Sequence, residues 1–164
     1  MKPDYKLVAK AKYIHLTAEL ADELWRECRK RWYNPKQLDT LVEALQSPEA
    51  IEEQIDAGAN YFIIQLGGKP IGYFAWKMEN TALCLMWIYL KPEYRGKALG
   101  QGVLSSCERL ARAEGKGRVF CAVPTRSLPV IQFFKAQGYR PVGPADQTVE
   151  GILLEQTEME RILR

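Results

Sequence analysis

Hydrophobic positions along the chain follow a helical spacing in the first third and mostly β-type patterns after it. The segment 6–16 alternates apolar residues with lysines, which predicts a first, partly exposed strand. Thr17 is predicted to cap a helix that continues towards Trp32. Asn34-Pro35 and Ser47-Pro48 each predict a further helix start, because Asn and Ser are favoured N-caps and Pro fits the first helical position.

A run of strands follows these helices. Segments 61–66 and 71–76 are rich in β-forming residues and are separated by Gly67-Gly68, so they predict a hairpin. Ala82–Leu90 contains nine consecutive uncharged, mostly apolar residues. A strand of this composition is expected at the centre of a sheet, with both of its faces covered.

The C-terminal half alternates helices and strands. An apolar stripe from Leu99 to Ala111 predicts a long amphipathic helix, 119–123 a short buried strand, and 127–137 another helix. The tail, 152–162, is predicted to form one last strand. Helices first, then an antiparallel meander, then alternating strands and helices indicate one α/β domain over 1–164, a layered sandwich with a mixed, mostly antiparallel sheet flanked by helices.

Composition excludes several other classes of protein. The net charge of +3, with Lys and Arg scattered among Asp and Glu, gives no basic stripe for nucleic acid. No apolar run reaches the ~20 residues of a membrane span, and the N-terminus lacks signal-peptide features. His15, the only histidine, is expected at the surface of the first strand. The cysteines lie far apart and predict buried thiols in a reducing cytoplasm rather than disulfides or a metal site: Cys28, Cys84, Cys107 and Cys121.

Candidate chemistry is concentrated in the loop between the buried strand and the long helix. The strand ends near Pro92, and the basic, glycine-containing sequence Arg95-Gly96-Lys97-Ala98-Leu99-Gly100 leads into the helix. A helix start exposes unpaired N–H groups and the positive end of the helix dipole. The glycines let an anion approach the backbone, so the loop predicts a cradle for a phosphate or pyrophosphate. The pattern is neither a Walker loop nor a dinucleotide fingerprint.

This loop resembles the acetyl-CoA signature of the GNAT acetyltransferases, Arg/Gln-x-x-Gly/Ala-x-Gly/Ala. A second stretch, 123–139, is similar to that family's strand, helix and Gly-Phe segment, with Gly138-Tyr139 standing for the Gly-Phe pair. The resemblance implies a GNAT-like three-layer sandwich that binds acetyl-CoA as cosubstrate, with no metal. It assigns contacts with the coenzyme to Ile88, Leu90, Arg95, Gly96, Lys97, Ala98, Leu99, Gly100, Gln101, Ser127 and Phe134.

The resemblance also implies a mechanism, with two departures. The acceptor amine would attack the thioester directly, and backbone N–H groups at a bulge near Ile88 and Leu90 would stabilise the oxyanion. Phe134 replaces the family's usual tyrosine acid, so we interpret it as an apolar wall of the pantetheine channel. Tyr89, Tyr94, Tyr139 or a water are left as proton donors, and no base is assigned. Ser127 replaces the usual asparagine and is expected to cap a helix.

The acceptor is expected between the N-terminal helices and the splayed central strands. Trp32, Tyr33 and Trp87 could line this pocket, and ordinary core packing explains them equally well. The sequence therefore predicts a cytoplasmic N-acetyltransferase acting on an amine-bearing small molecule or peptide, with no nucleic acid or membrane partner. A homodimer stays open. The alternatives are a catalytically silent acyl-CoA-binding module and a nucleotide-phosphate-binding regulator.

Overall fold

The structure, a computed structural model, describes residues 2–164 and forms helices and strands along nearly the whole chain. In chain order the elements are β1 (Asp4–Leu7), α1 (Ala11–Arg29), α2 (Pro35–Gln46), α3 (Pro48–Asp56), β2 (Asn60–Leu66), β3 (Lys69–Met78), β4 (Ala82–Leu90), the 3-10 helix η1 (Pro92–Tyr94), α4 (Leu99–Ala113), β5 (Arg118–Pro124), α5 (Leu128–Ala136), β6 (Arg140–Pro144), β7 (Gln147–Val149), β8 (Ile152–Leu154) and β9 (Gln156–Ile162).

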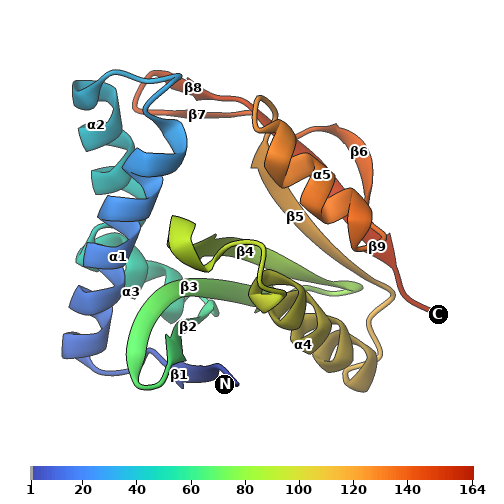
Figure 1. The fold of residues 1–164 in the computed structure, drawn as a ribbon. Coiled ribbons are helices and arrows are strands. Elements are labelled where there is room, and N and C mark those ends of the chain that lie inside the picture. The colour runs from blue at the N-terminus through green and yellow to red at the C-terminus, as the bar shows by residue number, and fades with distance from the viewer. Residues whose placement is uncertain (1) are drawn as a thin grey trace.

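Seven strands form the main sheet, in the spatial order β1-β2-β3-β4-β5-β9-β6. Every neighbouring pair is antiparallel except β4 and β5, which run parallel. β4 lies at the middle of this order, as its uncharged sequence predicted. β7 and β8 form a separate two-stranded hairpin, which Figure 1 shows reaching from the C-terminal half towards α1 and α2.

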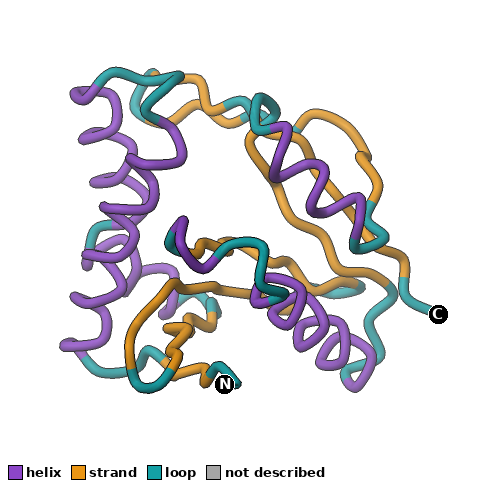
Figure 2. The backbone as a smooth tube through the Cα atoms, viewed as in Figure 1, coloured by secondary structure: helices purple, strands orange, loops and turns teal. Residues whose placement is uncertain are grey.

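Helices cover the sheet on both faces, so the predicted three-layer arrangement is confirmed (Figures 1 and 2). One core lies between α1–α3 and the sheet and contains Leu24, Trp25 and Tyr73. The other lies between α4, α5 and the opposite face and contains Val103, Leu104 and Phe134. Both cores draw on the central strands, so β4 is held from two sides.

The predicted starts of α2 and α3 are confirmed in detail. The Asn34 side chain accepts a hydrogen bond from the Gln37 N–H at 2.8 Å, and the Gln37 side chain accepts one from the Asn34 N–H at 2.9 Å. This reciprocal pair is a capping box. The Ser47 hydroxyl oxygen accepts from the Ala50 N–H at 3.1 Å.

The predicted first strand is wrong beyond residue 7. Helix α1 begins at Ala11, so Thr17 lies inside it and its hydroxyl donates to the Tyr13 carbonyl at 2.7 Å instead of capping. His15 is exposed, as expected, but on this helix. Ile14, Thr17, Ala21 and Leu24 are buried at three- and four-residue spacing, and this helical stripe outweighs the local apolar–lysine alternation.

The predicted single C-terminal strand is also wrong. Residues 152–154 form β8, which pairs with β7, and β9 then pairs with β5 and β6 in the main sheet. Between the paired residues of this hairpin, Glu150 and Gly151 both adopt positive φ values, 50° and 79°. Two left-handed residues at a two-residue turn reverse the chain tightly.

Candidate active site

The central feature of the site is a split between β4 and β5. The two strands pair only where Ala82–Cys84 faces Arg118–Phe120. β4 then continues to Leu90 and β5 to Pro124 without pairing with each other, and Figure 1 shows them diverging. Backbone groups that would normally join neighbouring strands are thus left facing an opening in the middle of the sheet.

The backbone of Ile88 and Leu90 faces this split. The Lys91 N–H donates to the Ile71 carbonyl of β3 at 2.9 Å. N–H groups alternate in direction along a strand, so those of Ile88 and Leu90 point away from β3. In agreement, the Leu90 carbonyl accepts a hydrogen bond at 3.0 Å from the Arg95 side chain, which lies outside the sheet.

The bulge expected near Ile88 and Leu90 lies at Met86. Ala75 of β3 faces Trp87, while the next residue of β3, Trp76, faces Leu85, so Met86 has no partner. A bulge turns a strand and increases its twist. It stands where β4 leaves β5, two residues before the backbone groups that face the split.

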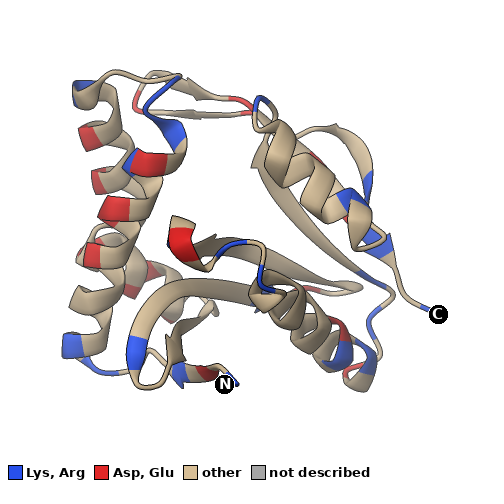
Figure 3. Cartoon of the chain, in the orientation of Figure 1, with Lys and Arg blue, Asp and Glu red and all other residues tan. Residues whose placement is uncertain are grey.

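The start of α4 is an uncapped helix N-terminus. Ala98 occupies the N-cap position with φ 62°, and no side chain caps the first turn. Gly96 is also left-handed, with φ 76°. The first N–H groups of a helix have no intrahelical partner and carry partial positive charge, which suits them to an anion. Figure 3 shows the basic residues of the loop that leads into this helix.

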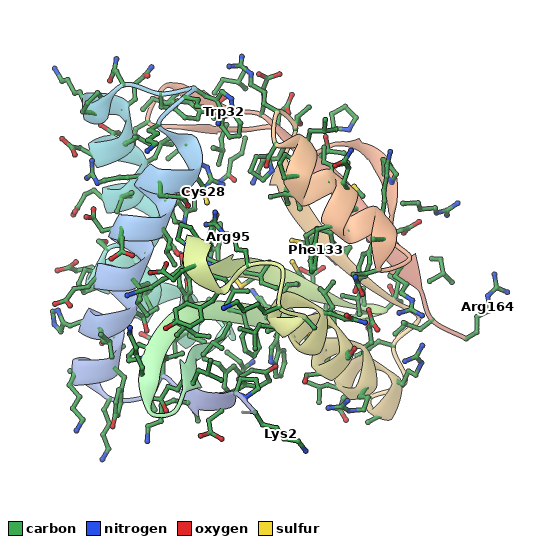
Figure 4. All side chains as sticks on the ribbon, in the orientation of Figure 1. Lys2, Cys28, Trp32, Arg95, Phe133 and Arg164 are labelled. Carbon is green, nitrogen blue, oxygen red and sulfur yellow. The ribbon has the colours of Figure 1, made fainter. Side chains whose placement is uncertain are left out.

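Arg95 braces the loop against α1. Its Nη2 lies 2.6 Å from Oε1 of Glu27, and its Nε donates to the Leu90 carbonyl at 3.0 Å. Figure 4 shows Arg95 close to Cys28 on the same helix. The hydrogen bond from Arg95 lowers the pKa of Glu27, so this pair is charged at neutral pH. Arg95 therefore positions the loop from behind rather than standing at the first turn of α4.

Gly100 brings α4 close to α5. A Cβ built at Gly100 would lie 3.0 Å from Cζ of Phe133, which Figure 4 shows beside the gap between the two helices. Phe134 is only 1% exposed and contacts Phe133 and Tyr139 edge-on, each with ring centres 5.3 Å apart. Ser127 stands at the N-cap of α5, but its side chain makes no capping hydrogen bond. Phe133, rather than Phe134, is thus the ring next to the α4 terminus.

The three phenols proposed from sequence have different surroundings. Tyr139 donates to Oε2 of Glu108 at 2.8 Å, and burial raises its pKa. Tyr94 lies half-buried in η1, with Lys97 Nζ 5.9 Å from its ring centre. Tyr89 is on the split strand itself, and burial raises its pKa to about 12. Tyr89 is therefore a neutral phenol at physiological pH.

The three aromatic residues proposed for the acceptor site do not share one pocket. Trp32 and Tyr33 line a small hollow at the end of α1, and the Tyr33 hydroxyl donates to the Leu153 carbonyl at 2.8 Å. The Trp87 indole instead contacts Trp25 edge-on and donates to the Gln54 side chain at 3.0 Å. Trp87 is thus turned towards α1 and α3.

A residue that the sequence reasoning missed also lines the hollow. The full lining is Arg29, Trp32, Tyr33, Pro124, Arg126, Leu154 and Glu155. Arg29 is buried at the end of α1, although it is charged. Its place in the sequence gives a signal: it lies four residues after buried Trp25, on the same face of the helix as Ala21.

Two further properties concern residues 2–164. None of the helices described there is both long and apolar enough to cross a membrane. No three side chains among the His, Cys, Asp and Glu residues described come together as metal ligands would. All four cysteines are free thiols, two of them buried and two half-buried.

Comparisons with known proteins agree with this arrangement. The family model described as "Acetyltransferase (GNAT) family" matches residues 17–139. PaiA N-acetyltransferase from Thermoplasma acidophilum, solved in complex with coenzyme A, has a TM-score of 0.80 at 18% identity, covering 99% of this chain and 100% of its own. A GCN5-related N-acetyltransferase from Rhodopseudomonas palustris has a TM-score of 0.82 at 18% identity, with 99% and 97% covered. At this identity the two structures establish the fold.

A curated relative extends the comparison to sequence. It is a Bacillus subtilis (strain 168) protein, provisionally named [ribosomal protein bS18]-alanine N-acetyltransferase. It is 30% identical over 86 residues, which span 52% of this chain and 56% of the relative, so the match covers about half of each protein. The family model alone spans most of the chain, including the split, the loop and α4. The chain therefore belongs to the acetyltransferase (GNAT) family.

Proposed function

We propose that this chain, as a single domain over residues 1–164, transfers an acetyl group from acetyl-CoA to a primary amine. The observation that carries the proposal is that β4 and β5 separate after three paired residues, close to the uncapped N-terminus of α4. The N-terminus of α4 offers backbone N–H groups to a pyrophosphate. The separation of β4 and β5 offers an opening in which a thioester can meet an amine. Acetyl-CoA, when bound, supplies the activated acetyl group.

The coenzyme would be held mainly by backbone groups. N–H groups from Gly96 to Gln101 fit a pyrophosphate, because the chain turns through left-handed conformations at Gly96 and Ala98 and no side chain caps the helix. The Arg95 N–H, predicted to belong to this set, instead donates to the Pro92 carbonyl at 3.2 Å. Lys97 adds positive charge to the same loop. The Phe133 ring, against Gly100, would flank the pyrophosphate on the α5 side. Ser127 and Phe134 have weaker support, since Phe134 is almost fully buried.

For the chemical step, the chain offers donors in the split. The N–H groups of Ile88 and Leu90 point into the split. They are suited to stabilise the oxyanion that forms when the amine attacks the thioester directly in a ternary complex. Tyr89 is suited to donate a proton to the leaving thiolate, because its phenol is neutral and the residue lies between Ile88 and Leu90 in β4. Its side chain faces α1, where the acceptor is expected.

The acceptor would enter beside the end of α1, where Trp32 and Tyr33 line the hollow. Trp87 would not contact the acceptor itself but would pack against Trp25 of α1. The free thiols agree with a reducing compartment, and we propose the cytoplasm. A homodimer stays a prediction.

Ligand binding and turnover test this function separately. Acetyl-CoA should raise the melting temperature, because a ligand that binds only the folded state stabilises it, and ATP should compete poorly. Thioester turnover should then be measured with polyamines, amino acids and a peptide that begins with alanine. Binding without turnover of any amine would favour the silent acyl-CoA-binding module. No stabilisation at concentrations far above micromolar, or tighter binding of ATP, would refute the proposal.

A further inference from the structure

Arg29 is a buried charge that forms no ion pair with the residues described, 2–164. The residue is 1% exposed, and its Nε and Nη1 atoms have no hydrogen-bond partner among residues 2–164. The guanidinium lies against the Trp25 ring, with Cζ 3.9 Å from the ring centre, and 5.7 Å from the ring centre of Tyr89. Neither aromatic residue accepts a hydrogen bond from Nε or Nη1 of Arg29.

An arginine stays protonated in a protein, so Arg29 cannot avoid the cost of burial by losing its charge. Buried charges are normally paired or fully hydrogen-bonded. The nearest acids in sequence and in the hollow are already used: Glu27 pairs with Arg95 at 2.6 Å, and Glu155 pairs with Arg126 at 3.1 Å. The Nε and Nη1 groups of Arg29 are therefore left without a partner among residues 2–164.

The position of Arg29 connects it with the split in the sheet. The hollow it lines includes Pro124, the last residue of β5, while Tyr89 beside it belongs to β4. Figure 4 labels Cys28 and Trp32, which mark the end of α1 that carries Arg29. A ligand group held by Arg29 would thus lie next to both strands that border the proposed reaction site.

We infer that Arg29 binds a carboxylate of the acceptor, so that the acceptor is a small amine bearing a carboxylate, of the amino-acid class. This inference rests on the proposed acetyl transfer. One guanidinium balances one carboxylate, and hydrogen bonds between ionised partners are the strong ones. A polyamine would instead bring positive charge next to Arg29 and Arg126.

The hollow beside Arg29 is small and partly open to solvent. Trp32, Tyr33 and Leu154 supply aromatic and apolar walls for the remainder of the acceptor.

The test compares amino acids with their amides in three proteins. The variants are Arg29→Met, which keeps an apolar stem against Trp25, and Arg26→Met, a control on the same helix whose partners Asp22 and Asp39 are exposed. Binding is measured by calorimetry in the presence of coenzyme A, and turnover with acetyl-CoA. The probes are a panel of L-amino acids, the matching amino acid amides, spermidine and O-phosphoethanolamine.

The wild type and Arg26→Met should bind at least one amino acid about ten- to a hundredfold more tightly than its amide, the range for a hydrogen bond to a charged group. Arg29→Met should lose that preference. The Arg29→Met protein should melt at the same or a higher temperature than the wild type, because replacing an unpaired buried charge with an apolar side chain is often neutral or stabilising. Should Arg29→Met not fold, Arg29→Lys keeps the charge without the planar fork, and a several-fold weaker preference for amino acids is expected.

Equal binding of acids and amides by the wild type, an unchanged preference in Arg29→Met, or a preference for spermidine would overturn the inference. Arg29-dependent binding that favours O-phosphoethanolamine would refute the carboxylate and indicate a phosphate. Acetyl transfer without any carboxylate preference would reject the inference and leave the proposed function standing. Arg29-dependent binding of amino acids without any binding of acetyl-CoA would support the carboxylate site and refute the proposed acetyl transfer.

Discussion

At the scale of single residues, Ala98 is a non-glycine residue in a left-handed conformation, with φ 62° at the N-cap of α4. This conformation costs a residue with a Cβ about 1–2 kcal/mol. The loop thus holds a strained backbone where the coenzyme is proposed to bind, and the sequence shows this position only as an alanine within the signature.

Ala98→Gly should therefore stabilise the protein, by a few tenths to about 1 kcal/mol. Relief of the left-handed strain is partly offset by the greater freedom that glycine gives the unfolded chain. Chemical denaturation measures the change. Gln101→Gly is the matched control in the same turn, where glycine should cost about 1 kcal/mol as in any exposed helix. Equal destabilisation by both changes would mean that Ala98 is not strained.

Tyr89 is the second residue whose surroundings predict its behaviour. Tyr89→Phe should lower kcat by about 10²–10⁴-fold, the usual contribution of a general acid, and leave the affinity for acetyl-CoA unchanged. Tyr94→Phe is the control, since that phenol lies outside β4. If Tyr94→Phe alone slows turnover, the proton donor is Tyr94.

The pH dependence follows from the raised pKa of Tyr89. A phenol with a pKa of about 12 keeps its proton across the physiological range, so it can donate at all these values. Turnover should rise with pH as the acceptor amine deprotonates, without a fall from this group below about pH 10. A loss of activity that begins near pH 8 in the wild type and is absent in Tyr89→Phe would contradict this assignment.

Arg29 shows what sequence reasoning could have found. It continues a stripe in which Ala21 and Trp25 are buried, at the four-residue spacing of one helix face. A charged side chain in that stripe either reaches solvent or is buried with a partner that balances its charge. Sequence alone could not decide between these, because Arg29 is buried by distant segments around Tyr89, Pro124 and Leu154.

At the scale of elements, local signals explain which boundaries could be predicted. α2 and α3 begin at Asn34 and Ser47, where cap residues and proline act within a few positions of each other. α1 begins after Lys10, whose side chain makes no capping bond, so no local signal marks this start. β7 and β8 have three residues each and pair only with one another, which leaves too short a pattern to recognise.

The junction of α4 and α5 depends on the missing side chain of Gly100. Gly100→Ala would place a Cβ 3.0 Å from the Phe133 ring, and the ring would have to move. We expect a several-fold weaker affinity for acetyl-CoA, measured by calorimetry, because Phe133 flanks the proposed pyrophosphate site. The gain in helix propensity, up to about 1 kcal/mol, should largely offset the strain in unfolding experiments.

Gly102→Ala is the matched control, because a Cβ at Gly102 would meet only the Tyr5 hydroxyl, at 3.5 Å. This variant should be more stable than the wild type, with unchanged affinity for acetyl-CoA. If both alanine variants bind the coenzyme as well as the wild type does, the contact between Gly100 and Phe133 has no part in the cradle.

At the scale of the whole molecule, the short β4–β5 pairing leaves two halves that other contacts must join. The β7–β8 hairpin is such a contact, since Val149 and Leu154 are buried in the core formed with α1–α3. The Tyr33 hydroxyl adds a hydrogen bond to the Leu153 carbonyl. Figure 1 shows the hairpin extending from the C-terminal half to the helices on the other side of the split. The segment that borders the proposed acceptor hollow is therefore also one that holds the halves together.

Tyr33→Phe should reveal this double role. Loss of one hydrogen bond should cost about 1 kcal/mol of stability, and the hairpin should open more often. Amide hydrogen exchange in residues 147–154 should become faster, and KM for the acceptor should rise several-fold while the Kd for acetyl-CoA stays the same. The two constants should respond differently because the hairpin borders the end of α1, whereas the coenzyme is proposed to bind at α4. Tyr13→Phe is the control, because Tyr13 lies in the first turn of α1 near Lys6 and Lys12, at the opposite end of the helix from the hollow, and it should change none of these values. Faster exchange with an unchanged acceptor KM would show that the hairpin joins the halves without shaping the acceptor site.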